Sequence, residues 1–310
     1  KPMIEAQAIG RAYGSIKAVD EVTLQIGQGE IVALLGPNGA GKTTCMRLIS
    51  GFLRPDKGYA RIAGFDSSRN PLQARQALGY MPEHAPVYRE STVLAFLRFI
   101  AGARGMPKAR AKAAIDDMLG RLDLDSIAYR AVGTLSKGSM RRVAFAAAVM
   151  HRPSVLLLDE PTDGLDPIQK AQVRGLILEL AKNSAVLLST HQSDEVLALC
   201  PRTVILANGR KLADTGTEEL LMQSKYHNAV SFIAAESIAA RAALDGIPGI
   251  SGFEQNAVDG RLYVFVQGNK PQNALIADKL SQKNVAYHDM RLEYGRLDEV
   301  FAKTVGEYPA

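Results

Sequence analysis

The distribution of apolar residues along the chain predicts a layered α/β domain in its first two thirds. Short apolar runs bounded by turn residues predict strands, because a strand that is buried on both faces needs a continuous apolar stretch. The clearest runs are VTLQI at 22–26, EIVALL at 30–35, VLLLD at 155–159 and AVLLST at 185–190. Helical patterns separate most of these runs, and this alternation favours a largely parallel, buried sheet.

Two further segments have different patterns of apolar residues. From about Ser91 to Tyr129 apolar residues recur at helical spacing with no strand between them, so we expect a helical subdomain, at about 91–150, inserted into the α/β core. After about Ser224 the pattern predicts strands again, among them RLYVFVQG with its period of two, and the helix NALIADKLSQ. The expected order is β-α-β-β-α-β, as in a ferredoxin-like fold. The sequence therefore predicts a first domain at 1–223 and a small α+β accessory domain at 224–310.

Composition adds only weak constraints on function. The chain has 310 residues, is 47% hydrophobic, and has 37 Lys and Arg against 32 Asp and Glu, giving a net charge of +5. This excess suits an anionic ligand or a membrane surface, and equally an ordinary solvated surface. Cys45 and Cys200 lie far apart without a CxxC pattern, which argues against a disulfide framework or a zinc site and favours the reducing cytoplasm. No run approaches the roughly 18 apolar residues of a spanning helix, so we expect any membrane role to come through a partner.

The stretch GPNGAGKTT follows the apolar run EIVALL and precedes a helical pattern, and it matches G-x-x-x-x-G-K-[ST]. Glycines let the backbone turn its N–H groups toward phosphate oxygens, and the following helix adds the positive end of its dipole. We expect Lys42 to reach the β- and γ-phosphates and the Thr43 hydroxyl to ligate Mg²⁺. A glycine-rich turn without a ligand is the alternative, but the strand and helix on either side favour nucleoside triphosphate binding. The candidate phosphate-binding residues are Gly36, Pro37, Asn38, Gly39, Ala40, Gly41, Lys42, Thr43 and Thr44.

Two acids, Asp159 and Glu160, end the apolar run VLLLDE. A carboxylate at the carboxyl end of a buried strand emerges where ligands bind in such sheets, so Asp159 is placed to hold Mg²⁺ through water. Glu160 is placed to polarise the attacking water. Taken alone, such a pair is more often a solvated strand end. Together with the phosphate loop, it predicts a catalytic site.

The order of the remaining motifs resembles that of the ABC ATPases over about residues 3–223. LSKGS lies about twenty residues before the acid pair, and STH ends about thirty residues after it. The resemblance implies a P-loop NTPase (ABC ATPase) core, with 36–44 as the Walker A loop and Asp159 with Glu160 as the Walker B pair. It also implies the roles of five residues outside these motifs: Tyr13 stacks on adenine, Ser136 and Gly138 of the signature bind the γ-phosphate, Asp166 of DGLD lies at the dimer contact, and His191 senses the γ-phosphate.

The sequence departs from the family pattern at two motifs. Glu83 replaces the usual glutamine of the Q-loop, which keeps an oxygen that can approach Mg²⁺ but loses the amide N–H donor. In the signature, Lys137 replaces a glycine and Ser139 a glutamine. Lys137 either adds an ammonium to the phosphate contact or is merely tolerated there. Both departures resemble the exporter-type branch that includes gliding-motility, multidrug and copper-maturation transporter ATPases.

The resemblance also implies an assembly. Two chains would form a homodimer with two ATP molecules between them, each held by the phosphate loop of one chain and the LSKGS signature of the other. The inserted helices and the Glu83 loop would contact separately encoded transmembrane permease subunits. We therefore expect a peripheral protein on the cytoplasmic face of the inner membrane, and no nucleic acid partner.

Two questions stay open at the level of sequence. The accessory domain, with its closing helix RLDEVFAKTV, resembles domains appended in the same branch and could dimerise, bind a regulator or cover a surface. The alternative function is a soluble ABC ATPase in metal-cluster assembly or translation. The single phosphate loop and single signature argue against the translation class, whose members normally carry two cassettes.

Overall fold

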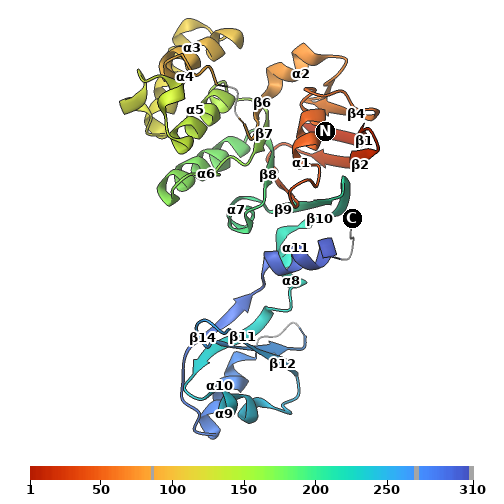
Figure 1. Cartoon of the computed structure of the whole chain (residues 1–310), viewed down its shortest axis with the longest axis vertical. Helices are drawn as coiled ribbons and strands as arrows, with labels where there is room; N and C mark the ends of the chain where they lie inside the picture. The colour runs from red at the N-terminus through yellow and green to blue at the C-terminus, as the bar shows by residue number, and fades with distance from the viewer. Residues whose placement is uncertain (85–86, 269–271, 307–310) are drawn as a thin grey trace. The chain divides into compact units, whose positions relative to one another are not determined.

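The computed structural model describes residues 1–84, 87–268 and 272–306 (Figure 1). The chain divides into two compact units, the first spanning Lys1–Thr217 and the second beginning at Glu218. The division thus falls just before the domain boundary that the sequence suggests at 223/224. Residues 307–310 at the end of the expected accessory domain lie outside the described residues.

The central layer of the first unit is a six-stranded sheet with the order β10-β9-β3-β8-β7-β6. All neighbouring strands are parallel except β10, which runs antiparallel to β9. Every residue of β3, β7 and β8 is buried, which explains why these strands appear in the sequence as continuous apolar runs. The strands are β3 (Ile31–Leu35), β6 (Leu78–Met81), β7 (Val155–Asp159), β8 (Ala185–Thr190), β9 (Arg202–Ala207) and β10 (Arg210–Gly216).

A second sheet in this unit is antiparallel and has the order β2-β1-β4-β5. The run VTLQI belongs to this sheet rather than to the parallel one. Its alternate residues Val22, Leu24 and Ile26 are buried while Thr23 and Gln25 are not, which is the period of a strand covered on one face. The core joins both sheets around α1 (Lys42–Ile49). The strands are β1 (Ile4–Tyr13), β2 (Ile16–Ile26), β4 (Lys57–Ile62) and β5 (Phe65–Asp66).

Helices gather on one side of the six-stranded sheet, where α3, α4 and α5 lie together, away from β1 and β4 (Figure 1). The described residues from 91 to 129 form no strand, as the helical spacing predicts. α3 begins where the Thr92 hydroxyl accepts a hydrogen bond from the Ala95 N–H. The remaining helices of the unit are α2 (Pro71–Ala77), α3 (Val93–Ala103), α4 (Lys108–Arg121), α5 (Lys137–Val149), α6 (Pro167–Ala181) and α7 (Ser193–Leu199).

The second unit contains a four-stranded antiparallel sheet with the order β12-β13-β11-β14, packed on α9 and α10. The sequence predicts a strand at RLYVFVQG, which is β13, and a helix at NALIADKLSQ, which is α10, but it locates no segment for α9 or β12. Most of β12 is only partly buried, so it lacks the alternation that marks a strand. The elements are β11 (His227–Ala234), α9 (Ser237–Leu244), β12 (Ile250–Gln255), β13 (Leu262–Val266), α10 (Asn273–Gln282) and β14 (Tyr287–Tyr294), flanked by α8 (Thr217–Met222) and α11 (Leu297–Gly306).

Across the described part of the chain, no helix combines the length and the apolar character that crossing a membrane requires.

Candidate nucleotide site

The loop from β3 to α1 can be built only with glycine at two positions. A Cβ on Gly36 would lie 2.6 Å from the Leu206 carbonyl oxygen of β9. Gly41 has φ +99°, and a Cβ there would lie 2.2 Å from the Ala18 carbonyl oxygen of β2. The backbones of β9 and β2 therefore approach the loop so closely that only glycine fits at positions 36 and 41.

The end of this loop has the features of an anion-binding helix terminus. The N-cap of α1 is Gly41, which provides no side-chain cap, and the first turn carries no acidic residue. The first N–H groups of a helix have no acceptor within the helix, and the dipole adds partial positive charge there. Thr43 and Thr44 in this turn are half-buried, while residues 37–39 are exposed. The loop can therefore receive phosphate oxygens from the solvent side.

Lys42 is buried and turns back over the loop. Its ammonium donates to the carbonyl oxygens of Gly36 at 2.5 Å and Pro37 at 3.0 Å. Burial lowers the pKa of Lys42 below its ordinary value, while the negative charges of Glu160, Asp159 and Glu83 act in the opposite direction. The structure thus brings all three predicted acids within electrostatic range of the predicted phosphate-binding lysine.

Asp159 ends β7 and is almost fully buried. One carboxylate oxygen, Oδ1, accepts a hydrogen bond from the Ser189 hydroxyl of β8. The other, Oδ2, is buried and has no hydrogen-bond partner among the described residues. A buried carboxylate oxygen without a donor is costly unless a cation or water satisfies it, so this atom fits a role at a divalent cation.

Glu160 and His191 are in direct contact. Glu160 Oε1 lies 2.8 Å from His191 Nδ1, and Oε2 accepts a hydrogen bond of 3.3 Å from the Thr190 hydroxyl. Glu160 is 8% exposed, whereas the His191 side chain is 56% exposed. The buried carboxylate therefore orients an imidazole whose other nitrogen can reach a ligand from solvent.

The signature stretch begins α5. Ser136 is the N-cap, and its hydroxyl accepts from the Ser139 N–H at 3.2 Å. Gly138 is buried against the loop that precedes α6, where an added Cβ would lie 3.1 Å from the Gly164 carbonyl oxygen. Asp166 caps α6 by accepting from the Gln169 N–H at 2.9 Å. The signature and the DGLD segment therefore lie against each other within one chain.

Two predicted site residues, Tyr13 and Ser136, form no hydrogen bond or ion pair with the phosphate loop within the described part of the chain. Tyr13 ends β1, is 48% exposed, and lies under the Arg11 guanidinium, whose carbon is 5.4 Å from the ring centroid. Within the described residues, hydrogen bonds and ion pairs connect neither Tyr13 nor Ser136 to Lys42. Glu83 follows β6 and is exposed, but its backbone carbonyl accepts a hydrogen bond of 2.6 Å from Arg141.

Sequence reasoning missed two kinds of site residue. Ser189 and Thr190 at the end of β8 bind the two acids, although only their neighbour His191 carried a signal in the sequence. Arg141, to which the sequence assigned no role, donates to the backbone of Glu83, Asp159 and Glu160. Its acceptors are backbone carbonyls of distant segments, so no side-chain pattern could have revealed them.

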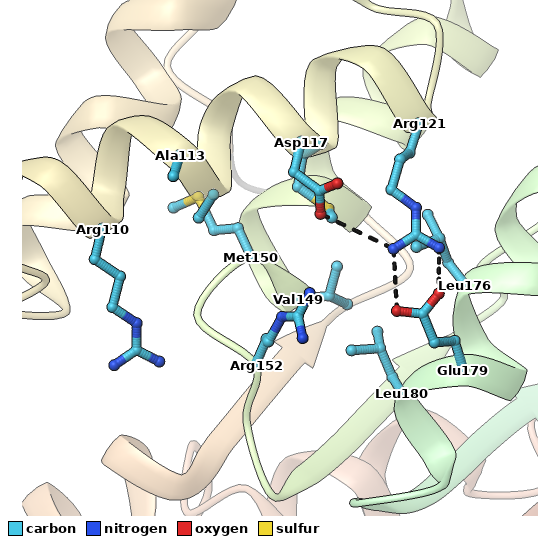
Figure 2. Close-up of a pocket in the computed structure, with 12 residues that line it drawn as sticks. Arg110, Ala113, Asp117, Arg121, Val149, Met150, Arg152, Leu176, Glu179 and Leu180 are labelled. Atoms are coloured by element: carbon cyan, nitrogen blue, oxygen red, sulfur yellow. Dashed lines mark hydrogen bonds and ion pairs between the residues drawn. The ribbon is translucent and has the colours of Figure 1, made fainter.

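A separate pocket of about 230 Å³ lies between α4, the end of α5 and α6 (Figure 2). Its floor is apolar, with Met150 and Leu180 among the lining residues, and Arg110 lies at its edge. Arg121 in its wall forms an ion pair with Glu179, as the dashed lines in Figure 2 show. None of the predicted nucleotide-site residues lines this pocket.

A mainly parallel sheet, a glycine-bounded phosphate loop opening a helix, and a buried acid pair on a neighbouring strand define a P-loop nucleoside triphosphatase. Within this class the chain belongs to the ABC transporter ATP-binding family, whose model, described as ABC transporter, matches residues 19–163. As a member of this family it binds ATP and hydrolyses it.

Two relatives match almost the whole chain. The daunorubicin resistance ATP-binding protein DrrA2 of Streptomyces coeruleorubidus is 32% identical over 98% of this chain and 95% of its own length. The Nod factor export ATP-binding protein I of Paraburkholderia xenovorans is 32% identical over 98% of this chain and 97% of its own length. The similarity therefore includes the second unit as well as the ATPase unit.

Solved structures show the same fold. The structure of an ATP binding subunit of an ABC transporter has a TM-score of 0.68 and 30% identity, covering 71% of this chain and 92% of its own. The dimeric structure of MJ0796, a bacterial ABC transporter cassette, has a TM-score of 0.64 and 23% identity, covering 69% of this chain and 98% of its own. The second likeness, at this identity, establishes the fold alone.

Proposed function

We propose that this chain is the ATP-hydrolysing subunit of an exporter-type ABC transporter that acts as a homodimer on separately encoded membrane subunits. The observation that carries the proposal is the contact of Glu160 with His191 beside the Lys42 loop, in a chain similar over its whole length to two export or resistance ATP-binding proteins. The relatives' names favour transport over a soluble role in metal-cluster assembly or translation.

The phosphate loop binds the triphosphate of ATP through the N–H groups at the start of α1 and the Lys42 ammonium. Mg²⁺ is usually held by one or two protein oxygens together with phosphates and water, so the unpartnered Asp159 Oδ2 and the Thr43 hydroxyl fit it. The carboxylate of Glu83 offers a further oxygen. When bound, Mg²⁺ neutralises charge on the phosphate oxygens.

The chain's own residues then supply the hydrolytic step. Glu160 accepts a hydrogen bond from the attacking water and orients it toward the γ-phosphorus, which is the positioning role of a catalytic carboxylate. His191, oriented by Glu160 and open to solvent, donates a hydrogen bond to a γ-phosphate oxygen. Glu160 and His191 thus act on the same phosphate, Glu160 through the attacking water and His191 through a phosphate oxygen.

The second half of each site comes from another copy of the chain. Ser136 and the N–H of Gly138 at the start of α5 would face the γ-phosphate in the partner's loop, and Asp166 would lie at the contact between chains. Tyr13 would stack on adenine. The dimer of the related MJ0796 cassette supports this arrangement at the level of the fold.

An exposed aromatic pair supports a membrane partner. Tyr88 and Phe99 are 58% and 53% exposed, with ring centroids 5.2 Å apart in an edge-to-face arrangement. Tyr88 lies close in sequence to Glu83, and Phe99 lies on α3, so a subunit bound to both residues would lie close to the Glu83 loop. Exposed large aromatic groups of this kind are typical of contact sites. The protein would then be peripheral, on the cytoplasmic face of the membrane.

The test is purification of the tagged chain from washed native membranes, followed by identification of the multi-span chains that accompany it. The double variant Tyr88→Ser/Phe99→Ser should lose these chains but keep its ATPase activity in solution. Ile238→Ser, which removes an 86% exposed side chain from the second unit, is the matched control and should retain them. Co-purification of the native chain with soluble scaffold proteins alone would overturn the transporter assignment.

A further inference from the structure

The guanidinium of Arg141 joins three parts of the site. It extends from α5 and is only 7% exposed. Nη1 donates to the Glu83 carbonyl at 2.6 Å, and Nη2 donates to the carbonyls of Asp159, at 3.0 Å, and Glu160. One side chain of the signature helix therefore binds the backbone of both the Glu83 loop and the acid pair.

The Glu160 backbone needs such support. Its φ is +51°, in the left-handed region that is unfavourable for a residue other than glycine. Hydrogen bonds constrain the residue on both sides, since its N–H donates to the Ser189 carbonyl at 2.9 Å and its own carbonyl accepts from Arg141. This conformation directs the side chain toward His191. A residue that holds the peptide therefore also sets the direction of the carboxylate.

Arginine is suited to this position by shape and by charge. Its planar fork presents several donors in fixed directions, whereas a lysine ammonium is a single point that cannot reach two separate segments with the same geometry. Burial lowers the pKa of Arg141, and the carboxylates of Asp163, Glu160, Asp159 and Glu83 act against that shift. The cation thus balances a group of four acids as well as satisfying three carbonyls.

We propose that Arg141 is a positioning residue for hydrolysis, which holds the Glu160 peptide in its left-handed conformation and couples the carboxylate to the signature helix and the Glu83 loop. The inference rests on the proposed roles of Glu160 and Glu83. A displacement of α5 or of the Glu83 loop would reach Glu160 through one guanidinium. Alignment of the attacking water then depends on the signature helix and the Glu83 loop being in place.

The neighbouring residue supplies a matched control. Arg142 is equally buried, at 5% exposed, and also binds backbone carbonyls. Its acceptors are the carbonyls of Leu122 and Asp123 in the helical subdomain and, at 3.3 Å, the Ser139 hydroxyl of its own helix, and none of them belongs to the Glu83 loop or the acid pair. A substitution of Arg142 therefore tests the cost of disturbing a buried arginine of α5 without touching Glu160.

The experiment compares ATP hydrolysis by Arg141→Lys and Arg142→Lys. Misplacing a catalytic group by about 1 Å can cost about 100-fold, so kcat of Arg141→Lys should fall 10- to 100-fold while KM for ATP and the thermal midpoint stay close to those of Arg142→Lys. The kcat of Arg141→Gln, which lacks the cation, should fall at least as far. This variant replaces Arg141→Lys in the comparison if the lysine variant folds poorly. Retention of kcat within twofold by a folded Arg141 variant, or an equal loss in Arg142→Lys, would overturn the inference.

The second measurement is a double-mutant cycle with Glu160→Gln. If Arg141 acts through Glu160, Arg141→Lys should not slow the residual rate of Glu160→Gln any further. An equal loss in both backgrounds would show that Arg141 has only a structural role. The single variant Glu160→Gln tests the proposed function separately: a normal rate there would reject Glu160 as the catalytic carboxylate, whatever Arg141 does.

Discussion

The Lys137 ammonium forms an ion pair of 2.7 Å with the Asp163 carboxylate of its own chain. Its aliphatic part also lies across Gly164, where an added Cβ would be 3.3 Å from Lys137 Cδ. The lysine that replaces a glycine of the family signature therefore binds the segment after the acid pair, a contact that neither of the two sequence-based alternatives for Lys137 had included.

Lys137→Met should change the stability of the chain little. The pair is exposed, at 71% and 36% for the two side chains, and exposed pairs contribute about 0–1 kcal/mol. ATP affinity of the isolated chain should also be unchanged, because the lysine contacts no part of its own phosphate loop in the described structure. Thermal unfolding and nucleotide titration check both points. Lys112→Met, which breaks the exposed pair with Asp116, is the control, and a loss clearly above that of this control would show that Lys137 does more.

Glu160→Gln should slow hydrolysis by at least about 100-fold, since removing a catalytic acid-base group costs about 100- to 10,000-fold. Nucleotide binding should persist, because the amide keeps the size of the carboxylate and the Lys42 loop is unchanged. Steady-state phosphate release and nucleotide titration measure the two effects. Glu90→Gln, at an exposed position near the Glu83 loop, is the control.

Lys42→Ala should weaken nucleotide binding strongly, because the variant loses the ammonium that lies over the loop. Chains with Lys42→Ala mixed with chains carrying Ser136→Arg test the composite site. If the signature acts on the partner's loop, each mixed dimer has one intact site and one site damaged twice, so some activity should return. Mixtures as inactive as the separate variants would argue against this geometry.

His151 should make the chain less stable in mild acid. Burial, with the nearby charges of Arg104 and Arg110, lowers its pKa from 6.5 to about 4, although the backbone of Leu78 accepts a hydrogen bond from the ring. Between these values the unfolded chain binds a proton that the folded chain does not. Stability is therefore lost as the pH falls from about 6.5 toward 4, by at most about 3 kcal/mol.

His151→Gln isolates this contribution. As the pH falls through this range, the unfolding free energy of the native chain should decrease relative to that of the variant, which has no imidazole to titrate. Urea unfolding at several pH values measures it. A difference that does not depend on pH would show that His151 titrates normally in the folded chain.

Glu195 should make the chain less stable as the pH rises, which is the opposite of the effect of His151. Burial raises the pKa of this carboxyl above 4.5, against hydrogen bonds such as the one of 2.7 Å from the Thr162 hydroxyl. Above about pH 4.5 the unfolded chain releases a proton that the folded chain retains, so the native chain loses stability as the pH rises through the raised pKa. Glu195→Gln lacks this loss, and its thermal midpoint should gain on the native chain as the pH rises from 4.5 toward neutrality. A midpoint difference that is constant over this range would contradict the assignment.

The local parts of the site could be predicted from the sequence. Gly36, Gly41 and Lys42 fall at a strand-to-helix turn, and Asp159 falls at the end of a buried strand, because apolar periodicity and glycine spacing are short-range properties. The helical subdomain and α10 could be predicted for the same reason. The expected β-α-β-β-α-β order includes a helix and a strand at the places of α9 and β12, but no apolar pattern located them, because their burial is partial and depends on packing within the second unit.

By itself, the sequence determined that the chain has a phosphate-binding loop, an acid pair and an α/β core, since each depends on residues that are neighbours along the chain. Only the tertiary structure decided which distant groups meet. It placed Glu160 against His191, left Asp159 Oδ2 without a partner, and put the three carbonyls of two segments around Arg141. Backbone carbonyls are the same in every residue, so their meeting with one side chain depends on the path of the whole chain and leaves no pattern in the sequence.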